Sequence, residues 1–260
     1  MRRPEPPDTS LEPPAGESYE LVADEALCAV EPDARDRRAV WRALVAPRSS
    51  SALGLDVVAL EAGASVTLGS DPDRHELVYV LAGAVELARG PERTSIAADA
   101  AFLHDGAQPA RVLAQTPARL AVFGAGPACD EHALLGERVP CARLDLGDTQ
   151  SATGRRSFQT LLGPQNGCCR ATMFVGAVPP GAAPWHFHQY DEIVYLLDGA
   201  AGYHQAGGVQ PMAPGNAIRI PPRHVHINEN TTGAVMRVLG VFTPAGSPAA
   251  AYLAPDPRRS

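Results

Sequence analysis

Five of the eight histidines fall between residues 186 and 226. His186 and His188 are one residue apart, so they point to the same face if this segment is a strand. Glu192 keeps the same parity, and His224 and His226 repeat the one-residue spacing in a second segment. Three imidazoles and one carboxylate that converge inside a small barrel suit a first-row transition metal. Four protein ligands leave positions open for water, substrate or dioxygen, as a catalytic metal requires.

The segment around Glu192 has a counterpart earlier in the chain. Residues 75–83 read HELVYVLAG and residues 191–199 read DEIVYLLDG. Short apolar runs recur about every ten residues around both segments, with Gly or Pro between them, and this spacing is typical of an antiparallel sandwich or barrel. The sequence therefore predicts an all-β chain built from two homologous units.

We place the two units at residues 45–128 and 157–253. A polar leader at residues 1–20 precedes them, and residues 129–156 form a linker with a possible helical turn, part of which could add an edge strand to a barrel. Residues 33–45 suit either a short helix or an additional strand, and the sequence does not decide between them.

The first unit lacks the metal-binding pattern. Counting back six and four residues from Glu76, the positions of the two histidines hold Ser70 and Pro72. The position equivalent to His226 is near Pro109. One carboxylate cannot hold a transition metal by itself, so we predict a metal-free first unit that is structural or forms a second pocket. His75 and His104 could line such a pocket.

The histidine segments resemble the two sequence motifs of the cupin family. The first motif reads Gly-x5-His-x-His-x3,4-Glu-x6-Gly, and it has one residue fewer here after its first glycine. The second motif reads Gly-x5-Pro-x-Gly-x2-His-x3-Asn, and here Arg223 replaces its central glycine. The matching positions are Gly181, His186, His188, Glu192 and Gly199 in the first motif, and Gly215, Pro221, His226 and Asn230 in the second.

This resemblance implies a bicupin, with two double-stranded β-helix (jelly-roll) units in tandem. It implies one divalent transition metal per chain, Mn or Fe in preference to Ni, Cu or Zn, and assigns His224 to the pocket. The metal ligands it implies are His186, His188, Glu192 and His226. We expect metal binding to weaken below about pH 6, where imidazoles take up protons.

Several residues of the second unit are candidates for contact with a substrate. An arginine beside the metal would hold a carboxylate or enolate bidentately, although both arginines could instead form salt bridges on the outer face. Glu192 is the candidate catalytic base because a ligand that detaches partly can accept a proton. The candidate substrate-binding residues are Tyr195, Tyr203, Arg219, His224 and Arg237.

Three classes of function remain open. The ligand set is similar to that of quercetin dioxygenase-like and oxalate-oxidising cupins, which implies an O2-dependent oxidoreductase acting on a small polar metabolite. The layout, with metal only in the second unit, resembles ureidoglycine aminohydrolase and implies a hydrolase or isomerase, although that family has a carboxylate where this chain has His186. The third class is a non-enzymatic cupin that binds a small molecule.

The composition argues against other classes. All 22 basic residues are Arg, so a Schiff-base or P-loop lysine is excluded, and a net charge of -7 without a basic face argues against nucleic-acid binding. No apolar run reaches the roughly 18 residues of a membrane span. Five cysteines without framework spacing fit a reducing cytoplasm. Because cupins pair edge strands and sheets, we expect a homodimer.

Overall fold

The computed structural model of the chain describes residues 22–48, 52–126 and 132–257. Within these ranges the only helical elements are two short 3-10 turns, η1 (Glu25–Leu27) and η2 (Pro164–Asn166), and all other regular structure is β-strand. The all-β prediction is therefore confirmed. No helix in the described part of the chain is long and apolar enough to cross a membrane. The predicted leader at residues 1–20 lies outside the described residues.

The first unit is a sandwich of a seven-stranded and a four-stranded antiparallel sheet, with strand orders β12-β9-β6-β11-β4-β3-β2 and β5-β10-β7-β8. The larger sheet contains β2 (Glu31–Pro32), β3 (Ala39–Val45), β4 (Gly54–Leu60), β6 (His75–Ala82), β9 (Ala100–His104), β11 (Ala118–Ala125) and β12 (Ala142–Arg143). The smaller sheet contains β5 (Ser65–Leu68), β7 (Ala84–Arg89), β8 (Glu92–Ala97) and β10 (Ala110–Ala114). Residues 39–45 thus form a strand, and the linker does add an edge strand, β12.

The second unit has a seven-stranded sheet in the order β1-β20-β17-β22-β15-β14-β13, a three-stranded sheet in the order β19-β18-β21 and the pair β16-β23. The seven strands are β1 (Ala23–Asp24), β13 (Gln150–Ser151), β14 (Ser157–Leu162), β15 (Thr172–Val178), β17 (Asp191–Asp198), β20 (Asn216–Ile220) and β22 (Met236–Thr243). The others are β16 (His186–Phe187), β18 (Ala201–Gln205), β19 (Gly208–Met212), β21 (Ile227–Asn230) and β23 (Tyr252–Leu253). Strand β1, from the start of the described chain, pairs with β20 of this second unit.

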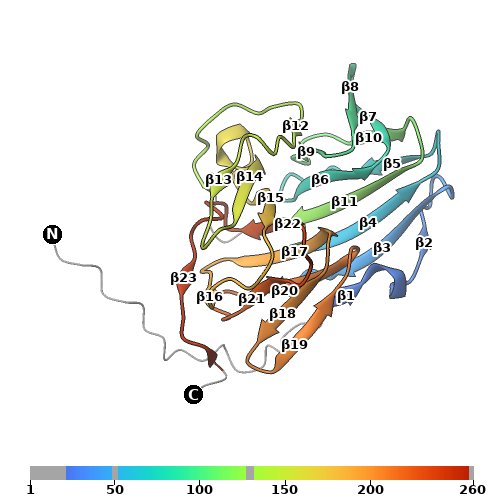
Figure 1. Cartoon of the computed structure of the whole chain (residues 1–260). Coiled ribbons are helices and arrows are strands. Elements are labelled where there is room, and N and C mark those ends of the chain that lie inside the picture. The colour runs from blue at the N-terminus through green and yellow to red at the C-terminus, as the bar shows by residue number, and fades with distance from the viewer. Residues whose placement is uncertain (1–21, 49–51, 127–131, 258–260) are drawn as a thin grey trace.

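The repeat in the sequence corresponds to a repeat in topology. Strand β6 lies between β9 and β11, and its counterpart β17 lies between β20 and β22. Figure 1 shows the blue-to-green strands of the first unit beside the yellow-to-red strands of the second. The two seven-stranded sheets are therefore equivalent, and each offers its outer face to the other unit.

The central strands bury both faces, which explains their nearly continuous apolar sequences. Alternate residues face the core of their own unit or the core between the units. The residues facing the other unit are Leu77 and Tyr79 in β6 and Ile193 and Tyr195 in β17, whereas Val78, Val80, Val194 and Leu196 face their own unit. Because one apolar core is shared by both seven-stranded sheets, the units are packed together rather than joined only by the linker.

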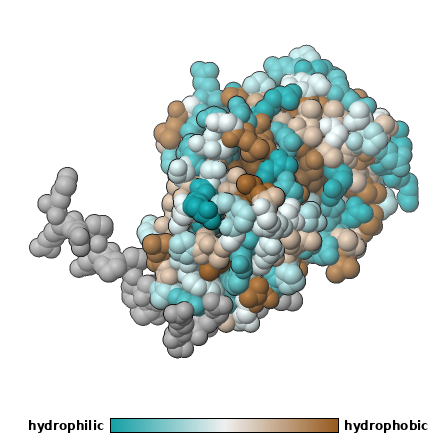
Figure 2. Space-filling model, viewed as in Figure 1, coloured by the Kyte–Doolittle hydropathy of each residue, from teal (hydrophilic) through white to brown (hydrophobic). Residues whose placement is uncertain are grey.

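The surface has few large apolar residues. In Figure 2 hydrophobic residues are interspersed with hydrophilic ones over the face shown. Exposed aliphatic side chains such as Leu27, Leu135 and Leu253 come from different elements. Scattered single residues of this kind are normal on soluble domains.

Candidate metal centre

Three histidines of the second unit converge at one end of its sandwich. One ring nitrogen from each of His186, His188 and His226 lies within 4.8 Å of the others, and all three side chains are buried. The backbones of His186 and His226 bridge each other, with N–O distances of 3.3 and 2.9 Å. This bridge joins the two histidine segments, which are about forty residues apart in the sequence. The metal cluster therefore depends on main-chain pairing between β16 and the segment before β21.

Each of the three rings has its Nδ1 against a backbone carbonyl. A carbonyl oxygen only accepts hydrogen bonds, so Nδ1 carries the proton and Nε2 keeps its lone pair. The acceptors are the carbonyl oxygens of Pro184 for His186 at 3.0 Å, Ala250 for His188 at 3.4 Å and His224 for His226 at 2.9 Å. The three Nε2 atoms therefore keep the lone pairs that a metal would bind, and hydrogen bonds from the other ring nitrogen to a carbonyl oxygen orient histidines in metal sites.

Glu192 lies on β17 beside the histidines. Its Oε2 is 3.7 Å from Nε2 of His188, and its side chain is buried. Burial raises the pKa of Glu192 to about 8, Asp191 adds to this effect and the guanidinium of Arg156 opposes it. A buried carboxylate beside three neutral imidazoles lacks a sufficient counter-charge, and a divalent cation would supply one. The four residues therefore fit a transition-metal site with nitrogen and oxygen ligands.

Arg223, which replaces the central glycine of the second motif, keeps the backbone that the glycine would adopt. Its φ is 65°, in the left-handed region that L residues rarely occupy. Its backbone N–H donates to the carbonyl oxygen of His188 at 2.6 Å. The turn before His226 is therefore retained despite the substitution.

Residues 174–242 match the family model of the cupin domain. The second unit therefore resembles a cupin domain over these residues. A search of the curated proteins finds no match.

Solved structures extend the likeness to both units. AerE from Microcystis aeruginosa is 11% identical with a TM-score of 0.66, covering 83% of this chain and 97% of that chain. A mutant of Bacillus subtilis oxalate decarboxylase OxdC is 15% identical with a TM-score of 0.68, covering 95% and 81%. The protein Ylba from E. coli is 11% identical with a TM-score of 0.67, covering 85% and 89%. These likenesses show that the chain has the bicupin fold.

Burial also changes the protonation of the histidines in the cupin site. It lowers the pKa of His186 to about 3 and that of His188 to about 4, and it holds the pKa of His226 well below its usual range. These lowered pKa values argue against imidazole protonation as the cause of weaker metal binding near pH 6. The imidazoles are already neutral at that pH, whereas Glu192 still carries a proton.

Metal binding should instead follow the titration of Glu192. Below its pKa of about 8 this carboxyl must lose a proton to become a ligand. We therefore expect the affinity for Mn²⁺ to rise about tenfold per pH unit from pH 6 to 8 and to level off above that range. Calorimetry in two buffers of different ionisation enthalpy measures the affinity and the released proton together. A Glu192→Gln variant should bind more weakly and with little pH dependence, and a flat profile in the unaltered protein would contradict this account.

A cavity of about 60 Å³ adjoins the histidines and Glu192. Its remaining wall is largely apolar and comes from β14, β15, β17, β22 and the segment before β23. The lining side chains include Phe158, Phe174, Tyr190, Val194, Val238 and Pro248. A cavity of this size holds a few waters or a ligand of a few atoms. Its ligand is therefore small, unless the segment before β23 moves.

Arg156 is the charged residue of this cavity that the sequence analysis missed. It lies in the loop before β14, and its guanidinium reaches within 3.5 Å of His186 Nε2. Its Nε donates to the carbonyl oxygen of Thr153 at 3.0 Å. Burial lowers the pKa of Arg156, whereas the nearby Glu192 raises it. Its position at the end of the predicted linker, directly before a strand, was the available signal.

Two of the predicted substrate residues, Tyr203 and His224, lie behind the metal cluster. The ring of Tyr203 is 5.8 Å from that of His226, and the ring of His224 is parallel to that of His226 at 6.3 Å. Neither is among the residues that line the cavity. Both rings therefore pack near the ring of His226 without lining the cavity.

Tyr195, Arg219 and Arg237, which were predicted as substrate residues, do not line the cavity beside the histidines. The reason is strand parity, because Glu192 and Val194 of β17 face the cavity whereas Tyr195 faces the other unit. Arg219 is buried against the first unit, where it contacts Asp191 at 3.1 Å and the carbonyl oxygen of Ala46 at 3.0 Å. Arg237 binds Asp198, as the salt-bridge alternative anticipated.

In the first unit an arginine, Arg74, lies at the position equivalent to a residue that lines the cavity of the second unit. Arg74 corresponds to Tyr190 in the repeat, and its guanidinium lies directly over Gly124, where a larger side chain would clash. Its Nε is 3.9 Å from Glu76, the counterpart of Glu192. Within the described residues the only candidate metal cluster is the one in the second unit. In the first unit the guanidinium of Arg74 thus supplies the positive charge beside Glu76. Ser70 and Pro72, at the positions of the two histidines, offer no imidazole to a metal.

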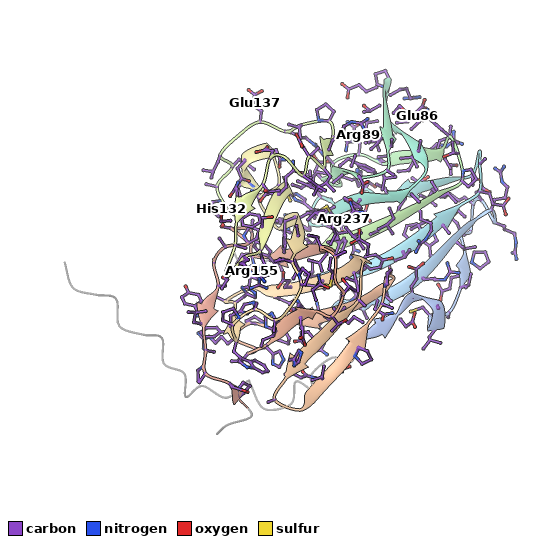
Figure 3. The ribbon with its side chains drawn as sticks, in the orientation of Figure 1. Glu86, Arg89, His132, Glu137, Arg155 and Arg237 are labelled. Atoms are coloured by element: carbon purple, nitrogen blue, oxygen red, sulfur yellow. The ribbon has the colours of Figure 1, made fainter. Side chains whose placement is uncertain are left out.

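The other predicted pocket histidines have different surroundings. His104 Nε2 is 2.6 Å from the carbonyl oxygen of Gly69. His75 Nδ1 is 3.8 Å from the sulfur of Cys168, which belongs to the second unit. His132 is exposed on the loop between the units, as Figure 3 shows.

Proposed function

We propose that this chain is a metal-dependent bicupin enzyme that acts on a small anionic, oxygen-rich metabolite. His186, His188, His226 and Glu192 would hold one divalent transition metal, and we favour Mn or Fe because the resemblance to cupins implies them. The observation that carries the proposal is the partly buried guanidinium of Arg156, which lines the same cavity and lies 3.5 Å from His186 Nε2.

The residues of the cavity have distinct tasks in this proposal. Arg156 is a donor for a substrate carboxylate, because a planar guanidinium binds carboxylate oxygens through paired hydrogen bonds. Glu192, as a ligand that can detach partly, can accept a proton at a carboxylate oxygen. The apolar wall around them excludes water and strengthens both electrostatic contacts. The metal would supply Lewis-acid or redox chemistry when bound.

Within this proposal we favour an O2-dependent oxidoreductase. The cavity adjoins the three imidazoles, so a small substrate in it would lie next to a metal that these residues held, and such a metal would supply redox chemistry with dioxygen. The alternative is a hydrolase or isomerase of the ureidoglycine aminohydrolase layout. The observation that favours the alternative is the restriction of the metal donors to the second unit, with Arg74 in the first. A non-enzymatic binder is the third possibility.

The test is turnover of the protein loaded with Mn²⁺ or Fe²⁺ against small carboxylates and ureido acids, in air and under argon. Oxygen uptake that stops under argon supports the oxidoreductase. Equal turnover in both atmospheres with release of ammonia supports the hydrolase. Saturable ligand binding without turnover of any of these compounds would make the chain a binder and overturn the enzyme proposal.

Arg156 provides the sharper measurement. We expect Arg156→Gln to weaken binding of an anionic substrate at least about tenfold, because a charged hydrogen bond is worth about 1.5–3 kcal/mol. The neighbouring Arg155, labelled in Figure 3, is exposed and donates to the carbonyl oxygen of Pro180. Arg155→Gln is therefore the matched control and should bind normally. Equal binding by both variants, measured by calorimetry on metal-loaded protein, would remove the assigned role of Arg156.

A further inference from the structure

A second cavity, of about 360 Å³, lies where the two units meet. Its walls carry two pairs of residues that are equivalent in the repeat, Tyr79 with Tyr195 and Arg119 with Arg237. Figure 3 labels Arg237 near the centre of the molecule. The cavity is therefore built around the approximate symmetry that relates the units.

On one side of this cavity a carboxylate of the first unit joins a tyrosine to an arginine. The hydroxyl of Tyr79 donates to Asp99 Oδ1 at 2.7 Å, and the guanidinium of Arg237 is 3.5 Å from the same oxygen. Asp99 directly precedes β9, and Arg237 comes from the second unit. This carboxylate therefore lies between donors from both units.

The opposite side of the cavity is formed by Tyr195 and Arg119, and the second unit has no carboxylate at the position equivalent to Asp99. The residue that precedes β20, and so corresponds to Asp99, is Gly215. Glu25 of η1 supplies the carboxylate instead. Its Oε2 accepts from Arg119 at 2.6 Å and from the Tyr195 hydroxyl at 3.0 Å. A Cβ added to Gly215 would lie 3.6 Å from this same oxygen, so Glu25 occupies the space that a side chain there would reach.

The segment that carries Glu25 is attached to the second unit by main-chain contacts. Ala23 and Asp24 pair with Ala217 and Asn216, and the N–H of Glu25 donates to the carbonyl oxygen of Gly215 at 3.3 Å. The contact is short because β1 has only two residues. A carboxylate is thus delivered to Arg119 and Tyr195 by a weakly paired segment of the same chain.

We propose that Arg119 and Tyr195 form a carboxylate-binding site at the junction of the two units, and that Glu25 is its tethered ligand. A guanidinium and a phenol that donate to one oxygen make a charge-assisted site for any small carboxylate. Open space adjoins it in the same cavity. In the unaltered protein Glu25 outcompetes free carboxylates because the main-chain contacts of β1 and Glu25 hold its carboxylate in place, so its binding costs little further entropy. This site is separate from the metal cavity and does not depend on the proposed function.

The test is chemical rescue of a Glu25→Ala variant of the whole chain, followed by thermal unfolding in sodium formate or sodium chloride at equal ionic strength. We expect the variant to unfold at a lower temperature. Formate should restore part of the loss and saturate, whereas chloride should not. In the unaltered protein the two salts should act equally. Equal effects of both salts on the variant would overturn the proposal.

A second variant ties the rescue to the proposed donors. Glu25→Ala combined with Arg119→Gln should lose the formate effect, and retention of that effect would show that formate acts elsewhere. If Glu25→Ala is insoluble, Glu25→Gln takes its place, because a neutral amide is a weaker partner for a guanidinium. Formate should then still stabilise Glu25→Gln more than the unaltered protein, and equal shifts would contradict the proposal.

Discussion

Replacing His188 by Ala should abolish metal retention by the second unit. The imidazole of His188 is one of only three in the buried cluster, and its Nε2 is the histidine nitrogen paired with Glu192 at 3.7 Å. Loss of an outer-shell partner costs about 10–100-fold in metal affinity, so loss of a direct ligand should cost more. Metal analysis after dialysis against a weak chelator should therefore fall from about one ion per chain to near zero.

The matched control is His204→Ala in the same unit. His204 is also partly buried and pairs with a carboxylate, Glu229, at 2.7 Å, but it does not belong to the cluster. Its replacement should leave the metal content unchanged. Full retention of metal after the change at His188, or equal losses in both variants, would refute the assignment.

Replacing Asp191 by Ala should destabilise the fold by about 3–5 kcal/mol, because it leaves a buried guanidinium without its carboxylate. The side chain of Arg219 is 1% exposed and that of Asp191 is 8% exposed. Such a cost is a large part of the 5–15 kcal/mol that holds a typical domain together. Chemical denaturation should show it as a lower midpoint at an unchanged slope.

Asp198→Ala is the control that shows how much of the lost stability is due to the burial of the ion pair. Asp198 also pairs with an arginine, Arg237, but their side chains are 41% and 28% exposed. Surface pairs of this kind are worth about 1 kcal/mol or less. The double variant Asp191→Ala with Arg219→Met should recover much of the lost stability, since an apolar side chain has no charge to bury. Equal losses at Asp191 and Asp198 would contradict the role assigned to burial.

The fold and the convergence of the histidines could be predicted because both follow from periodicity. The repeated apolar segments at 75–83 and 191–199 form equivalent central strands, and the one-residue histidine spacing brings three rings together. Glu192 also lies beside them, but not through strand parity, because β16 ends at Phe187 and a separate strand, β17, begins at Asp191.

The remainder of the site was not predictable, for a physical reason. Arg219 and Tyr195 lie close in sequence to the metal segment, but the opposite face of their strands is buried against another unit rather than exposed. A single strand pattern does not reveal which of two buried faces holds the cavity. Arg156 lies in a loop, and a loop has no regular side-chain alternation from which the direction of its side chain could be predicted.

The three Nδ1 hydrogen bonds have a consequence for how this protein can change. Their acceptors are the main-chain oxygens of Pro184, His224 and Ala250, and no side-chain substitution removes a main-chain oxygen. The specificity of the cavity, in contrast, depends on side chains such as Arg156 and Phe174. Mutation can therefore exchange the groups that choose a ligand while the orientation of the imidazoles persists, so new specificities can evolve without loss of the histidine arrangement.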